Sequence, residues 1–101
     1  MAAISIAKEG NAQAVELISN GKWLAARRIL KNILDKQAPD QYNYGLTFEG
    51  GAETVEDYEE AKRIYVAALQ QDPTNSTIAQ GVGRMERRIK EAKKISAQRV
   101  N

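Results

Sequence analysis

Apolar residues recur every three or four positions over most of the chain, which is the spacing of amphipathic helices. Between residues 22 and 36 the apolar positions are Trp23, Ala26, Ile29, Leu30, Ile33 and Leu34. In a later segment that ends near residue 71 they are Tyr58, Ala61, Ile64, Tyr65, Ala68 and Leu69. Each set falls on one side of a helix, with charged residues on the other. The pattern predicts an all-α fold.

Turn-forming residues divide the chain into about five predicted helices. Asn20 and Gly21 tolerate the left-handed conformation that ends one helix before the next begins. A proline at position 39 disfavours helical geometry in the residue before it, and the Thr54–Asp57 spacing resembles a capping box. The predicted helices cover residues 11–19, 22–36, 39–48, 54–71 and 76 onward. The last helix carries an apolar stripe that could face the core or a second chain: Ile78, Val82, Met85, Ile89 and Ala92.

Length and composition limit the classes of function. At 101 residues the chain forms one domain, predicted to span residues 1–101. It has no cysteine and no histidine, which removes disulfides, thiol nucleophiles, the commonest zinc ligands and the usual neutral-pH base. We therefore expect no enzyme activity, no catalytic residues, no metal site and no cofactor. No apolar run is long enough to cross a bilayer and the first ten residues do not resemble a signal peptide, so we expect a cytoplasmic protein or one inside a soluble assembly.

The second and fourth predicted helices repeat one pattern at a shift of 35 residues. The segment 26–29 falls on 61–64, and Trp23 and Leu30 fall on Tyr58 and Tyr65. Self-similarity at this period indicates stacked helical hairpins, because a lone hairpin cannot bury its own apolar face.

The repeat resembles the tetratricopeptide repeat, a pair of antiparallel helices of about 34 residues. The second-helix pattern matches in Tyr58, Ala61, Tyr65, Ala68 and Pro73. The resemblance implies two and a half hairpins, with small residues where helices approach closely and a polar, amphipathic capping helix at the end. The packing positions it assigns are Trp23, Ala26, Leu30, Tyr44, Gly45, Phe48, Tyr58, Ala61, Tyr65, Ala68 and Pro73.

One departure from the family concerns the acidic segment 49–60, which holds six acids and no base. The turn between Phe48 and Tyr58 is about four residues longer than the family uses. We therefore expect this segment to protrude from the fold.

The resemblance also implies a binding groove, because the first helix of each hairpin in the family lines a concave surface for a peptide or helix. Carried over position by position, that surface consists of Lys8, Asn11, Val15, Tyr42, Asn43, Leu46, Arg84, Arg87 and Arg88. The three arginines favour an acidic or carboxylate-bearing protein partner. On this reading the chain is an adaptor, although the arginines equally suit the solvated face of an end helix.

Two alternatives follow from the charge distribution. Seven basic residues and two acids lie between Arg84 and the end of the chain, with residues 93–101 as a basic C-terminal arm. This arm and the acidic segment suit a structural subunit of a larger assembly, through homo-oligomeric or other contacts between opposite charges. Nucleic acid is a less favoured partner, because no aromatic residue is interleaved among the basic ones.

Overall fold

The computed structural model describes residues 3–4 and 9–100, with side chains at positions 3–4 and 11–95. All regular secondary structure in this part of the chain is helical, which confirms the all-α prediction. The helices are α1 (Glu9–Ser19), α2 (Trp23–Lys31), α3 (Ala38–Gly50), α4 (Val55–Gln71) and α5 (Ser76–Val100).

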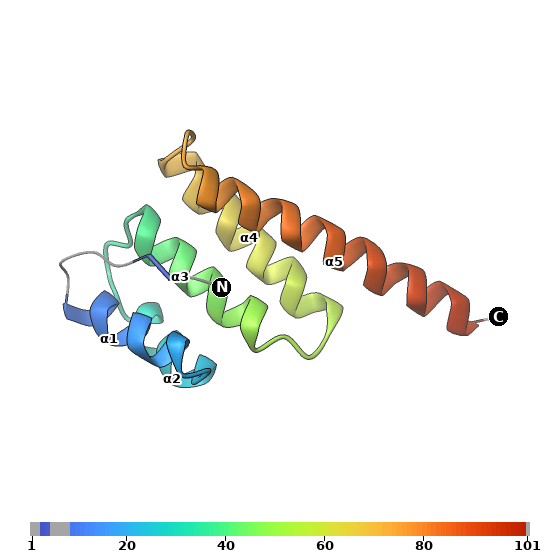
Figure 1. The fold of residues 1–101 in the computed structure, drawn as a ribbon, viewed down its shortest axis with the longest axis horizontal. Coiled ribbons are helices and arrows are strands. Elements are labelled where there is room, and N and C mark those ends of the chain that lie inside the picture. The colour runs from blue at the N-terminus through green and yellow to red at the C-terminus, as the bar shows by residue number, and fades with distance from the viewer. Residues whose placement is uncertain (1–2, 5–8, 101) are drawn as a thin grey trace.

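Each helix packs against the next one along the chain, and α1 also contacts α3 (Figure 1). The arrangement is therefore a row of antiparallel neighbours joined by short connections. The 25 residues of α5 make it the longest of the five helices, and its C-terminal end runs on past α4 (Figure 1).

The core is centred on Tyr65 of α4, which is fully buried. A Cβ added at Gly45 of α3 would lie 2.5 Å from the Tyr65 ring, and one at Gly81 of α5 would lie 3.1 Å from it. The Tyr42 ring stacks on the same ring, with the centroids 5.1 Å apart. Two glycines thus let three helices close around one aromatic side chain, because a larger residue at either position would meet the ring.

A capping box starts α4, as the Thr54–Asp57 spacing predicts. The Asp57 carboxylate accepts the backbone N–H groups of Glu53 at 2.9 Å and Thr54 at 3.1 Å. These two bonds lower the pKa of Asp57 below its ordinary value, because they stabilise the ionised form. A second capping box at the start of α3, formed by Gln37 and Asp40, was not predicted.

The second helix ends earlier than its periodicity predicts, at Lys31 rather than residue 36. The Lys36 ammonium donates to the carbonyl oxygens of Lys31 at 3.1 Å and Ile33 at 3.0 Å, which satisfies backbone groups at the helix end. Leu34, predicted on the apolar face, is fully exposed as a result. The predicted apolar face of this segment therefore packs against the core from Trp23 to Ile33 and fails at Leu34.

Candidate functional site

The predicted groove residues of α1 and α3 lie inside the molecule. Asn11, Asn43 and Leu46 are completely buried and Tyr42 is 2% exposed, while Val15 is half-buried. Lys8 lies outside the described residues. Asn11, Tyr42, Asn43 and Leu46 are therefore covered in this structure and do not form an open surface for a partner.

Residues 3 and 4 cover part of this region, since both pack against the core. The side-chain amide of Asn43 contacts both backbone groups of Ile4. Its Oδ1 accepts the Ile4 N–H at 2.7 Å, and its Nδ2 donates to the Ile4 carbonyl at 2.6 Å. Asn11 donates to the same carbonyl at 2.9 Å, and its Oδ1 accepts from Asn43 at 2.7 Å. Two buried amides therefore hold one residue by its backbone alone.

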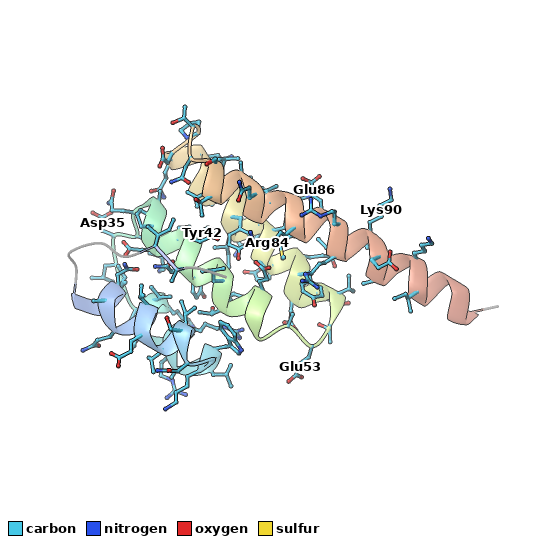
Figure 2. The ribbon with its side chains drawn as sticks, in the orientation of Figure 1. Asp35, Tyr42, Glu53, Arg84, Glu86 and Lys90 are labelled. Atoms are coloured by element: carbon cyan, nitrogen blue, oxygen red, sulfur yellow. The ribbon has the colours of Figure 1, made fainter. Side chains whose placement is uncertain are left out.

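Arg84 of α5 points at α3 rather than at solvent. Its guanidinium forms a bidentate ion pair with Glu49, with both N···O distances at 3.0 Å, and lies 3.4 Å from the Tyr42 hydroxyl. The Tyr65 hydroxyl donates to the same carboxylate at 2.6 Å. Figure 2 shows Tyr42 and Arg84 beside each other where α3 meets α5.

This network is a structural device that ties three helices together. Hydrogen bonding to Glu49 raises the pKa of Arg84, and burial, followed by the charge of Glu49, raises the pKa of Tyr65. Both groups therefore keep their neutral-pH protonation states: Arg84 positive and Tyr65 neutral. The location of Glu49 corrects the prediction of a protruding acidic segment, because α3 continues to Gly50 and buries this carboxylate.

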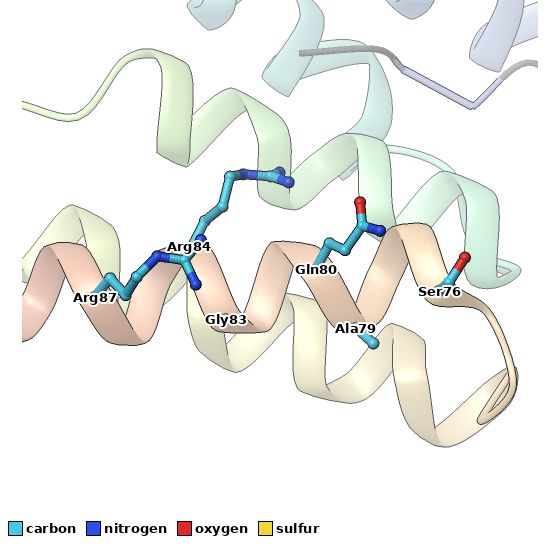
Figure 3. Close-up of a pocket in the computed structure, with 6 residues that line it drawn as sticks. All are labelled: Ser76, Ala79, Gln80, Gly83, Arg84 and Arg87. Atoms are coloured by element: carbon cyan, nitrogen blue, oxygen red, sulfur yellow. The ribbon is translucent and has the colours of Figure 1, made fainter.

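The structure brings Arg84 and Arg87 together at the edge of an open hollow on α5. The hollow has a volume of about 630 Å³ and is lined by Ser76, Ala79, Gln80, Gly83, Arg84 and Arg87 (Figure 3). Two of these lining residues, Ala79 and Gly83, are small. Arg87 is exposed and lies back along the helix toward Gly83, and it forms no ion pair with any described side chain.

Arg88 does not join the other two arginines. Its guanidinium lies 5.9 Å from the centroid of the Tyr58 ring, on the side of α5 that faces α4. The three arginines assigned to one surface therefore lie in different surroundings: one is paired inside the fold, one lines the hollow and one lies beside an aromatic ring.

The residues assigned to repeat packing fall mostly in or against the core. Six are buried: Ala26, Leu30, Gly45, Ala61, Tyr65 and Ala68. Four are half-buried and pack against the core: Trp23, Tyr44, Phe48 and Tyr58. Pro73 is exposed in the turn that follows α4, where it ends the helix.

Other kinds of site find no support in the part of the chain that the structure describes. It contains no group of three or more acidic side chains able to hold a metal ion. Nor does any of its helices have the length and apolar character that crossing a membrane requires.

Comparison of the chain with protein-family models, curated protein sequences and solved structures finds no match. The resemblance to tetratricopeptide repeats therefore stays a prediction that rests on the residues themselves.

Proposed function

We propose that this protein is a non-catalytic adaptor that binds an acidic segment of a partner protein on the exposed face of α5. The observation that carries the proposal is the open hollow on α5, which is lined by the exposed Arg87 together with the small residues Ala79 and Gly83. Arg84 is already neutralised by Glu49, so Arg87 supplies the positive charge for a ligand. A guanidinium in this position favours bidentate contact with a carboxylate.

The resemblance of the sequence to tetratricopeptide repeats supports the same function. In that family the first helix of each hairpin faces the ligand, and α5 occupies the position of a first helix after two hairpins. Its hollow opens to solvent, whereas the corresponding surfaces of α1 and α3 are covered.

The test is affinity capture with two charge-reversal variants of the full chain. Arg87→Glu reverses the charge at the hollow, and Lys90→Glu makes the same change on the same helix outside its lining. Both residues are exposed, so neither change disturbs the core. We expect one defined partner to be retained by the wild type and Lys90→Glu and lost by Arg87→Glu. Equal retention by all three would overturn the proposal, and sequence-indifferent oligonucleotide binding that falls steeply with salt would assign the basic helix to nucleic acid instead.

A second candidate function is that of a subunit in a larger assembly. Val66 of α4 and Ile95 of α5 are exposed apolar side chains, 36% and 45% accessible, and each borders a separate hollow beside α5. Coverage by another chain would bury both. Sedimentation of the wild type and an Ile95→Lys variant tests this function: an assembly that dissociates in the variant supports it, and a monomeric wild type excludes self-assembly.

A further inference from the structure

The contact between Ile4 and the two asparagines has the geometry of peptide recognition inside one chain. Asn43 accepts from the N–H and donates to the C=O of a single residue, at 2.7 and 2.6 Å. A side-chain amide can bond both groups of one residue only when that residue presents them to the same side, as an extended strand does. Asn11 reinforces the contact by donating to the same carbonyl.

These amides need an occupant. Asn11 and Asn43 are completely buried, and their bonds to each other use only one donor and one acceptor. Without Ile4, the Asn43 Oδ1, one of its N–H groups and the Asn11 amide would lose these partners and would need water or another backbone segment in their place. Buried polar groups without partners are strongly disfavoured. Asn11 of α1 and Asn43 of α3 are thus arranged to bind one stretch of extended backbone, and the place that Ile4 fills between them is called the crevice below.

We propose that this crevice is a binding site for an extended peptide, and that Ala3 and Ile4 occupy it as an intramolecular ligand which a partner segment displaces. The inference rests on the adaptor function proposed above and adds a second point of contact to it. The asparagines contact backbone only, so selectivity comes from the side chain at the position of Ile4, which is partly buried against the core. The ligand carries an aliphatic residue there and cannot carry proline, because proline has no N–H.

Because the chain's own segment occupies the crevice, a partner peptide must displace this segment in order to bind. Ile4 is joined to the first residue of α1, Glu9, by four intervening residues. A ligand tethered this closely has an effective concentration on the order of millimolar. A peptide added in trans therefore competes with this tethered segment. For a peptide whose own Kd is about 0.1 mM or lower, disrupting the Ile4 contact in the full chain should raise the apparent affinity at least tenfold.

The experiment uses a fluorescent peptide with the sequence of residues 1–8, MAAISIAK, and follows its anisotropy on titration with full-length protein. The protein variant is Ile4→Pro, which removes the N–H that donates to Asn43 Oδ1 and lies outside α1 to α5. The matched control is Ala3→Pro, which places proline one residue earlier and keeps the Ile4 N–H. A second peptide, N-methylated at its isoleucine 4, lacks the same donor.

We expect the native peptide to bind Ile4→Pro at least tenfold more tightly than it binds the wild type or Ala3→Pro, and the N-methylated peptide to bind none of them. Adding Asn43→Asp to Ile4→Pro should abolish binding, since a carboxylate cannot donate to the peptide carbonyl. Equal binding to the wild type and Ile4→Pro, or no binding to either, would overturn the proposal. Unfolding of Ile4→Pro, seen by circular dichroism, would overturn it too, because the segment would then belong to the core.

Three further outcomes distinguish this inference from the alternatives. A wild-type dimer that becomes monomeric in Ile4→Pro would place the segment in a second copy and overturn occupancy in cis. If the peptide fails to bind while a partner is still lost in Arg87→Glu, the crevice inference fails and the adaptor function stands. If the peptide binds as expected and Arg87→Glu retains every partner, the α5 surface is wrong and the crevice remains.

Discussion

Replacing Glu49 by alanine should destabilise the protein, because three helices share this one carboxylate. The Tyr65 hydroxyl would stay buried without an acceptor, at a cost of about 1–3 kcal/mol. The Arg84 side chain is 26% exposed, so water would partly hydrate its charge after the ion pair is lost. That loss adds about 1 kcal/mol rather than the full cost of a buried, unpaired charge. The free energy of unfolding should therefore fall by about 2–4 kcal/mol.

Urea denaturation followed by circular dichroism measures this loss, and the thermal midpoint should fall by at least about 8 °C for a domain of this size. Glu53→Ala is the matched control, because it removes an exposed carboxylate from the same acidic segment and should change stability by no more than about 0.5 kcal/mol. Glu49→Gln, which keeps the volume and an acceptor for Tyr65, should cost less than Glu49→Ala. If Glu49→Ala and Glu53→Ala had equal effects, the reasoning that joins α3, α4 and α5 through this carboxylate would be refuted.

Three further predictions concern the helices themselves. Ala61→Leu should overpack the fully buried contact of α4 and lower the free energy of unfolding by about 1–3 kcal/mol in urea titrations. Leu30→Ala should cost about 2–5 kcal/mol, while Leu34→Ala at a fully exposed position should leave the thermal midpoint unchanged, contrary to a helix that continued to residue 36. Asp57→Ala should cost about 0.5–2 kcal/mol at neutral pH. Because the folded protein lowers the pKa of Asp57, its contribution is present above the ordinary value of 3.8 and lost as the pH falls through the folded pKa, so the two proteins should converge in stability in acid.

The helices could be predicted from the sequence because their apolar spacing repeats many times, but single contacts decided where they end. Gly50 and Gly51 read as a loop, yet α3 continues to Gly50 because Trp23 packs directly on it. A Cβ at Gly50 would lie 2.5 Å from the Trp23 ring. The glycine pair marks a close approach between α2 and α3, and Glu49 is buried in the last turn of the helix that continues to it.

The candidate site was harder to predict, because it too depends on single contacts between residues that are far apart in the sequence. Asn11 and Asn43 were assigned to a binding surface, and the structure does place them together around a peptide backbone, although the peptide is the chain's own. Ile4 could not be found from sequence because its partner lies 39 positions away and the contact uses backbone atoms, which every residue has. Arg84 and Arg87 share one hollow, but only the contact with Glu49 shows which of them is already neutralised.

The end of α5 should be dispensable for the fold. Among the side chains of α5 that the structure describes, up to Ile95, Ile89 is the last large apolar one that packs against the core, and Ile95 is exposed. Beyond residue 91 the described side chains form one ion pair, between Lys93 and Glu59 at 3.7 Å, and both partners are largely exposed. Such a pair contributes about 0–1 kcal/mol because water and salt screen it.

Truncation after Glu91 should therefore lower the free energy of unfolding by no more than about 1 kcal/mol, with the helical circular-dichroism signal reduced only in proportion to the residues removed. Because Arg87 is retained, partner capture should survive the truncation. A truncated chain that unfolds would assign the distal turns of α5 to the core, and one that folds but loses its partner would move the binding surface from the hollow to the basic arm.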